Sequence, residues 1–265
     1  MKPTTHKIAL LAAMSFLFAV SAADAAQPPP PQPPQSGKAA APVDFTGQWV
    51  SVISEDWRWR MVTPLKGDFS NMPVTEAARQ VGAQWDPAKD EAAGEQCKGY
   101  GAMAIMREPG RLRITWQDDN TLKIETDAGQ QTRTLHFGVK QAPAGTPATL
   151  QGYSVAEWEG PPGGRPIGLA IGVQRAGRTS NTLKVTTTNI KPGYLRKNGI
   201  PFGEGAKLTE YFDKFEEPDG TEWFVITTLA EDPVYLNAPW LTTLNFKKEK
   251  DADRAKWRPT PCSAR

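Results

Sequence analysis

From Asp44 onward, apolar and polar residues alternate in short runs separated by turn residues, a pattern typical of β-strands joined by short connections. The runs predict strands at residues 44–53, 111–116, 121–126, 131–139, 151–159, 182–190, 207–216, 222–230 and 240–248. Three connections, "QDDN", "DAGQ" and "EPDG", have the length and composition of hairpin turns. We therefore expect about nine strands, most of them paired with their sequence neighbours.

Helical signals are confined to one insertion between the first two strands. Thr75 is a suitable N-cap for a helix over 74–85, and Asp86 before Pro87 is the arrangement expected at the start of a second helix over 86–94. The Gly- and Arg-rich segment 160–181 predicts a loop, in which "GLAIGV" is a possible additional strand. The helices are thus expected to be accessory to the sheet.

So many strands with local connections must close or stack to protect their edges, so a barrel and a sandwich are the two physical choices. We favour an all-β fold, an antiparallel lipocalin-like β-barrel of about 8–10 strands with a short helical insertion, because Gly47 and Trp49 resemble the Gly-x-Trp opening of such barrels. Residues 44–265 are expected to form a single domain.

The N-terminal segment predicts export. Lys2 and Lys7 precede an apolar run at residues 8–20, and Ala23-Asp24-Ala25 has the small-x-small pattern of a cleavage site. Residues 1–25 are therefore expected to be a signal peptide, with an uncleaved anchor as the alternative. Residues 26–43 are Pro- and Ala-rich and predict an extended linker. We expect a periplasmic or secreted protein with no membrane association after cleavage.

Charge and cysteine content narrow the function classes. The formal net charge is +2, and removal of two lysines and one aspartate with the signal leaves about +1, which argues against nucleic-acid binding. Cys97 and Cys262 are the only cysteines, and in an oxidising compartment we expect them to form a disulfide; two free buried thiols are the alternative. With a single histidine in the mature chain, we expect no metal site and no cofactor.

Several segments resemble an uncharacterised family of exported bacterial proteins with a lipocalin-like β-barrel. These are "GYSVAEWE" (152–159), "TEYFDKF" (209–215) and "EDPVYLNAPW" (231–240), with further likeness at 55–61, 85–102, 105–133 and 183–201. The likeness covers most of the chain from Asp44 to Cys262. It implies a fold, export and a shared pocket, and it implies no catalytic residues.

Candidates for acid-base chemistry are carboxylates in otherwise apolar strands and the lone histidine. A carboxyl group near an aromatic wall has its ionised form disfavoured and can exchange a proton. The candidates are Glu55, Glu157, Glu210 and His136. The alternatives are structural ion pairs with arginines for the carboxylates and an outward-facing position for His136.

The aromatic residues suggest a ligand site inside the barrel. If they face inward, Trp57, Trp59, Trp116 and Trp158 form a wall suited to a flat ligand, and Arg133 and Tyr211 complete the candidate ligand-binding set. The alternative is that large rings simply fill the barrel.

For the segment "EDWRWRM" (55–61), the alternation predicts which side chains face the lumen. In a continuous strand counted from Trp49, Glu55, Trp57 and Trp59 face inward, whereas Arg58 and Arg60 face outward. A second segment, "PGYLRKNG" (192–199), is either a lid at the barrel mouth or a solvated loop.

Three functions follow from these patterns. The first is binding of a small apolar or aromatic ligand, with or without a negative charge, in the barrel lumen. The second is an enzyme on the same barrel, an isomerase, cyclase or hydrolase, that uses a carboxylate together with an arginine. The carboxylates are Glu55, Asp56, Glu157 and Glu210, and the arginines are Arg58 and Arg60. The third is a structural or interaction module, which gains weight if the lumen is solidly packed.

Overall fold

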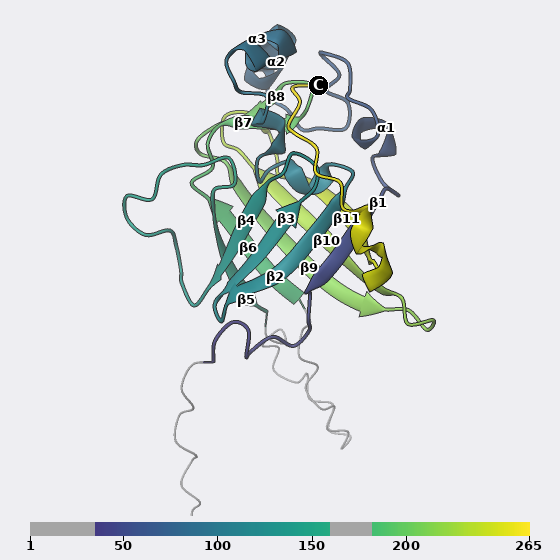
Figure 1. The fold of residues 1–265 in the computed structure, drawn as a ribbon. Coiled ribbons are helices and arrows are strands. Elements are labelled where there is room, and N and C mark those ends of the chain that lie inside the picture. Colours follow the sequence, from purple (N-terminus) through teal and green to yellow (C-terminus); the bar gives the residue numbers. More distant parts are fainter. Residues whose placement is uncertain (1–34, 160–181) are drawn as a thin grey trace, which may run out of the picture. The chain divides into compact units, whose positions relative to one another are not determined.

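The computed structural model describes residues 35–159 and 182–265, so the expected signal peptide, the first half of the linker and "GLAIGV" lie outside the described residues. Nine strands form a closed barrel in the order β1-β11-β10-β9-β6-β5-β4-β3-β2 (Figure 1). They are β1 (Gly47–Val52), β2 (Arg111–Asp118), β3 (Thr121–Thr126), β4 (Thr132–Phe137), β5 (Tyr153–Trp158), β6 (Thr182–Thr188), β9 (Lys207–Glu216), β10 (Glu222–Glu231) and β11 (Trp240–Lys248). The predicted β-barrel is confirmed.

One pairing differs from the expected antiparallel arrangement. β4 and β5 run parallel, with Leu135 opposite Ser154 and Phe137 opposite Ala156. The connection at 138–152 carries the chain back to the end of the barrel at which β4 begins, so β5 enters the sheet in the same direction. The barrel is therefore mixed, and the prediction of a purely antiparallel barrel was wrong.

Aromatic rings from β1, β9, β10 and β11 fill part of the lumen. Trp49 is fully buried and its indole N–H donates to the carbonyl of Phe45 at 2.8 Å. The ring of Phe224 lies 4.6 Å from Trp49 and 4.8 Å from Phe246, and 6.1 Å from Phe212. Rings packed at these separations bury large apolar areas and leave little room between them.

A second apolar cluster covers the other end of the barrel, which we call the mouth (Figure 1). It is formed by α2 (Glu76–Gln84) and the hairpin of β7 (Gly193–Arg196) and β8 (Ile200–Phe202), together with the ends of β9, β10 and β11. Both expected N-caps are confirmed: Thr75 accepts a hydrogen bond from the Ala78 amide, and Asp86 from the Ala88 amide at the start of α3 (Pro87–Ala92). Residues 193–196 of the segment 192–199 form β7 and residues 197–199 form the turn to β8; because residues 195, 196, 198 and 199 are buried, the segment is a hairpin at the mouth and not a solvated loop.

The strand expected to run from Trp49 through "EDWRWRM" ends early, and this prediction was wrong. β1 stops at Val52, and Trp57–Arg60 form a short helix, α1. Asp56 adopts left-handed backbone angles, φ 51° and ψ 23°, which turn the chain out of the sheet. In a helix, successive residues do not alternate between two faces, so the inward and outward positions expected for 55–60 do not apply.

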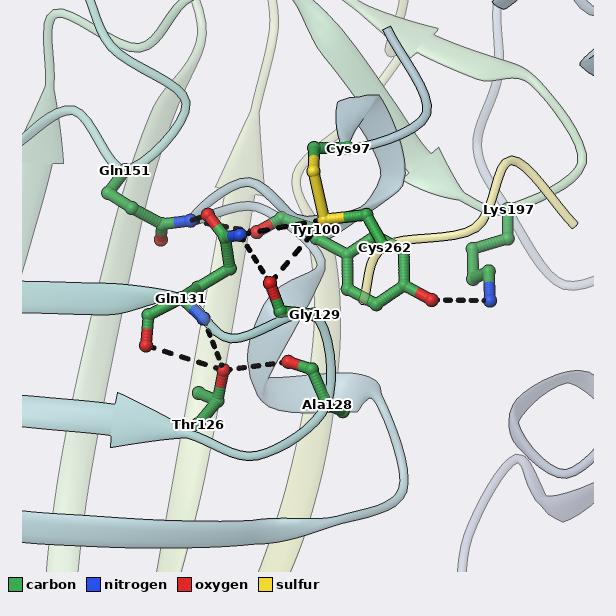
Figure 2. The surroundings of a disulfide bond; sticks show 9 residues. All are labelled: Cys97, Tyr100, Thr126, Ala128, Gly129, Gln131, Gln151, Lys197 and Cys262. Atoms are coloured by element: carbon green, nitrogen blue, oxygen red, sulfur yellow. Dashed lines mark hydrogen bonds between the residues drawn. A yellow bond between two sulfur atoms is a disulfide. The ribbon is translucent and has the colours of Figure 1, made fainter. Parts of the chain in front are cut away.

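Cys97 and Cys262 form the expected disulfide, which joins the C-terminal tail to the mouth (Figure 2). Cys97 immediately precedes the 3-10 helix η1 (Lys98–Tyr100), and two further 3-10 helices lie at Ile105–Arg107 (η2) and Asp251–Lys256 (η3). The backbone of Gly129, at φ +69°, passes so close to Tyr100 that an added Cβ would lie 2.3 Å from its ring. In the described parts of the chain, no helix has the length and apolar character needed to span a membrane.

Candidate functional site

Three buried arginines from three separate elements meet at the mouth. Arg60 lies at the end of α1, Arg107 at the end of η2 and Arg196 at the end of β7, and their exposed fractions are 7%, 7% and 4%. They line a cavity of about 210 Å³ together with residues 61–64, Trp59, Ala104, Glu108, Pro109, Leu195 and Lys197. Buried arginines are uncommon unless their charge is met by a partner, so their partners decide what the cavity is for.

Two of these arginines have carboxylate partners and the third has none in the described chain. Arg60 forms an ion pair with Glu55, and its Nε donates to the carbonyl of Arg107 at 2.9 Å. Arg107 Nη2 lies 2.9 Å from Asp56 Oδ2. Arg196 Nη1 donates to the carbonyl of Ser70 at 2.8 Å, and within residues 35–159 and 182–265 no ion pair involves it. Arg196 thus has no ion-pair partner, and the carboxylates of Asp56 and Asp68 act on its charge from a greater distance.

The same guanidinium groups lack acceptors for several N–H donors. Arg60 Nη2, Arg107 Nη1 and both Nε and Nη2 of Arg196 are buried, and none has a hydrogen-bond partner among the described residues. Nearly all buried donors in folded proteins are paired, and leaving one unpaired costs free energy. Four buried guanidinium nitrogens of the residues that line the cavity therefore have no acceptor oxygen.

Indole rings hold the guanidinium groups in place. The Cζ atom of Arg196 lies 5.0 Å from the ring centre of Trp59 and 5.5 Å from that of Trp240, and Arg107 Cζ lies 4.7 Å from Trp240. Trp59 is itself fixed by a hydrogen bond from its indole N–H to Asp68 at 3.2 Å. Stacking on aromatic faces orients the planar guanidinium without consuming its N–H donors.

A lysine and a carboxyl group complete the cavity wall. Lys197 Nζ lies 3.7 Å from Glu108 Oε2 and donates to the Tyr100 hydroxyl at 2.9 Å. Tyr100 is in turn placed beside the disulfide (Figure 2). Burial raises the pKa of Glu108 above its ordinary range, an effect that Lys197 and Arg107 partly offset. Glu108 is thus a carboxyl group that takes up its proton at a higher pH than an exposed glutamate does.

The arginines stay charged at neutral pH. Burial lowers the pKa of Arg60 to about 10 and that of Arg196 to about 10, and it also lowers the pKa of Arg107. Counting Lys197, four cations face three carboxylates, those of Glu55, Asp56 and Glu108. One positive charge therefore remains when all groups are ionised.

Two candidates from the sequence come together elsewhere, inside the barrel. Arg133 and Glu210 are fully buried and form two hydrogen bonds, at 3.0 Å and 2.5 Å. Thr187 lies 3.4 Å from Arg133 Nη2 and 2.8 Å from Ser154. Because Arg133 occupies both oxygens of Glu210, this carboxylate matches the structural ion pair that was the alternative to a catalytic role.

The remaining acid-base candidates lie apart from one another. Glu157 is on the outer face of β5, paired with Lys184 at 2.8 Å. His136 faces outward from β4, as its alternative predicted, and stacks on Tyr153 with ring centres 4.6 Å apart; burial lowers its pKa. Glu55 is the one that reaches the arginine cluster, through Arg60.

The expected aromatic wall does not form, because its four tryptophans lie in different places. Trp57 is 66% exposed, and Trp59 packs against Arg196 at the mouth. Trp116 and Trp158 flank Phe137 at the opposite end of the barrel, and their ring centres lie 5.3 Å and 5.6 Å from that of Phe137. Tyr211 is half-buried on β9 opposite Thr227.

Sequence reasoning missed Arg196, Lys197 and Glu108 as parts of a site. Arg107 was not among the candidate site residues, and Arg60 was expected to face outward. The one available signal was the concentration of Arg196 and Lys197 between turn residues in "PGYLRKNG", which marked a segment at the mouth but not the residues it meets.

This chain matches no protein-family model, no curated protein and no solved structure. The resemblance to exported bacterial barrels therefore stays a prediction. In residues 35–159 and 182–265, no group of three or more His, Cys, Asp and Glu side chains is arranged to hold a metal ion. The site must be interpreted from its own geometry.

Proposed function

We propose that this exported protein binds a small anionic molecule in the arginine-lined cavity at the barrel mouth. The observation that carries the proposal is the set of buried guanidinium N–H donors without acceptors on Arg60, Arg107 and Arg196. An anion supplies acceptor oxygens and neutralises the residual charge of Arg196 at once, and charge-assisted hydrogen bonds to arginine are among the strongest available.

Ligand binding in the lumen stays a prediction, but the mouth offers the better-built site. The void beside Glu210 and Thr228 measures about 10 Å³, whereas the cavity at Arg196 measures about 210 Å³. Pockets for drug-sized ligands occupy roughly 300–1,000 Å³, so the mouth cavity suits a smaller molecule. The formed disulfide and the N-terminal pattern support a periplasmic or secreted location.

The test is a titration of the mature protein with methanesulfonate, acetate and inorganic phosphate at constant ionic strength. Tryptophan fluorescence is a suitable signal because Trp59 and Trp240 contact the arginines. We expect saturable binding of at least one anion, weakened at least about tenfold by Arg196→Gln, since a hydrogen bond to a charged group contributes roughly 1.5–3 kcal/mol.

Arg58→Gln is the matched control. Arg58 is a neighbouring arginine that also stacks on Trp59, but its side chain is 68% exposed and it does not line the cavity. Its replacement is expected to change the dissociation constant by less than about twofold, because exposed charges are screened. An equal loss in both variants, or no saturable response to any of the anions, contradicts the proposal.

A second candidate function, an acid-base enzyme, is favoured by one observation. Glu108 places a carboxyl group with a raised pKa in the cavity that holds the anion-binding arginines. Such a group can accept a proton from a bound substrate while the arginines stabilise the negative charge that develops. Loss of turnover with retained anion binding in Glu108→Gln is the expected signature, and unchanged turnover of an identified substrate excludes this role.

A further inference from the structure

Exposed apolar residues are concentrated in the segment that follows Trp57, and two of them line the cavity. Trp57, Met61, Val62 and Leu65, which we call the rim, are 66%, 58%, 70% and 79% exposed. Nine large hydrophobic side chains are exposed in the described chain, and four of them fall within these nine consecutive residues. Scattered exposed apolar residues need no explanation, but a concentration beside a pocket marks a binding surface.

The rim is continuous with the cavity. Met61 and Val62 line it directly, and they follow Arg60 in the chain without interruption. The rim segment is held in position by the turn of the β7–β8 hairpin, since Asn198 Nδ2 donates to the carbonyls of Leu65 and Asp68 at 3.0 Å each. The exposed apolar side chains are therefore displayed from a backbone that is tied to the same hairpin as Arg196.

These two features imply a ligand with two ends. The arginine wall favours an anionic head, because Arg60, Arg107, Arg196 and Lys197 outnumber the carboxylates that form ion pairs with them. The rim offers apolar surface outside the cavity, where a neutral hydrocarbon chain can lie with one side still in water. A wholly polar anion would leave the rim unused, and a neutral lipid would leave the guanidinium donors without acceptors.

We propose that the arginine pocket and the rim together bind a single-chain anionic amphiphile, with its head at Arg196 and its alkyl chain along Met61, Val62 and Leu65. This inference rests on the proposed anion-binding function and specifies the class of ligand. It commits to a single dispersed molecule and not to the surface of a bilayer.

The test is a calorimetric titration of the mature protein with alkanesulfonates of increasing chain length, from methanesulfonate to octanesulfonate, below micelle-forming concentrations. The sulfonate head is a monoanion at every working pH. Affinity is expected to rise about twofold per added methylene, because a chain with one side in water loses about half of the surface that full burial would remove.

Variants separate the rim from the pocket. Trp57→Ser with Leu65→Ser, two rim residues that do not line the cavity, is expected to reduce the chain-length dependence while leaving methanesulfonate affinity unchanged. The matched control is Val139→Ser with Phe215→Ser, two exposed apolar residues that are 40% and 46% exposed and lie at the opposite end of the barrel. In this control, affinity is expected to rise with alkyl chain length as it does in the natural sequence.

Each contrary outcome has a distinct meaning. Methanesulfonate binding that needs Arg196 but does not strengthen with chain length overturns the amphiphile inference and leaves the anion site standing. Absence of binding by every alkanesulfonate overturns both. Octyl glucoside bound as tightly as octanesulfonate shows that the charged head is not needed and overturns the inference. Binding only to vesicles of phosphatidylcholine and phosphatidylglycerol, with no binding of dispersed octanesulfonate, also overturns it.

Discussion

Arg133 and Arg196 are both almost completely buried, yet their surroundings differ. Arg133 shares two hydrogen bonds with Glu210 and contacts Thr187, so most of its donors are occupied. Arg196 has one hydrogen bond, to the Ser70 carbonyl, and two indole faces. The first arrangement stabilises the barrel and leaves only Nε of Arg133 without a partner, whereas the second leaves both Nε and Nη2 of Arg196 without an acceptor.

Removing the carboxylate of the closed pair should be costly. Glu210→Gln leaves Arg133 charged and uncompensated in the barrel, and we expect the free energy of unfolding to fall by about 3 kcal/mol or more. Glu157→Gln removes an ion pair whose glutamate is 61% exposed and should cost less than about 0.5 kcal/mol. Urea unfolding of both variants measures the difference, and similar losses would show that Glu210 is not held as a buried charge.

Anion binding should strengthen as the pH falls. The pKa of Glu108 is raised by burial, so in the folded protein this group takes up its proton at a higher pH than an exposed glutamate. Protonation removes one negative charge from the cavity wall. As the pH falls through the raised pKa of Glu108, the dissociation constant for methanesulfonate is therefore expected to decrease.

Glu108→Gln provides the control for this pH dependence. Its side chain is permanently neutral, so the variant should bind methanesulfonate more tightly than the natural sequence near neutral pH and with little dependence on pH. Calorimetric titrations at several pH values measure both proteins, and an unchanged pH dependence in the variant assigns the effect to another group.

Among the elements, the β7–β8 hairpin has the largest influence on the site. It carries Arg196 and Lys197 into the cavity wall, and its turn residue Asn198 holds the rim segment through two backbone carbonyls. Gly199 closes the turn at φ +82°, where an added Cβ would lie 2.2 Å from Trp85. The hairpin geometry therefore depends on a residue without a side chain.

Gly199→Ala should destabilise the protein and weaken anion binding together. The backbone cost of a left-handed alanine and the overlap with Trp85 should total at least about 2 kcal/mol. Gly145→Ala is the matched control, because Gly145 has φ +79° but nothing lies within 4 Å of its added Cβ, so only the backbone cost of about 1 kcal/mol applies. Urea unfolding and methanesulfonate titration measure both variants, and equal effects would show that contact with Trp85 is unimportant.

At the scale of the whole molecule, one covalent bond joins the C-terminal tail to the segment that leads into η1. Cys97 and Cys262 are 165 residues apart in sequence, and the tail also pairs with the barrel through the Thr260 amide and the Asp127 carbonyl at 2.9 Å. The bond lies near Tyr100, which supports Lys197 in the cavity wall (Figure 2). It thus connects the stability of the chain to the site.

Loss of the disulfide should lower stability by about 5 kcal/mol on the chain-entropy estimate for so long a loop. The measurement is urea unfolding of the natural protein with and without reductant and of Cys97→Ser with Cys262→Ser. Reductant is expected to lower the midpoint of the natural protein to that of the variant and to leave the variant unchanged. A midpoint that does not respond to reductant would contradict a structural role for the bond.

Features that depend on neighbours in the sequence were predictable. Alternation identified the strands of the barrel, Thr75 and Asp86 identified the helix starts, and a chain with two cysteines allows a single disulfide pairing. These signals are local, or leave only one combination, so the sequence by itself determined them.

The candidate site was decided only by the tertiary structure. Arg60, Arg107 and Arg196 come from three elements, and their meeting depends on where β1 ends and on how the hairpin covers the mouth. In "EDWRWRM" the alternation predicted a strand, but pairing with β11 stops at Val52 and the left-handed Asp56 starts a helix. Long-range pairing thus overrode the local pattern, turned the Arg60 side chain into the cluster and left Trp57 exposed.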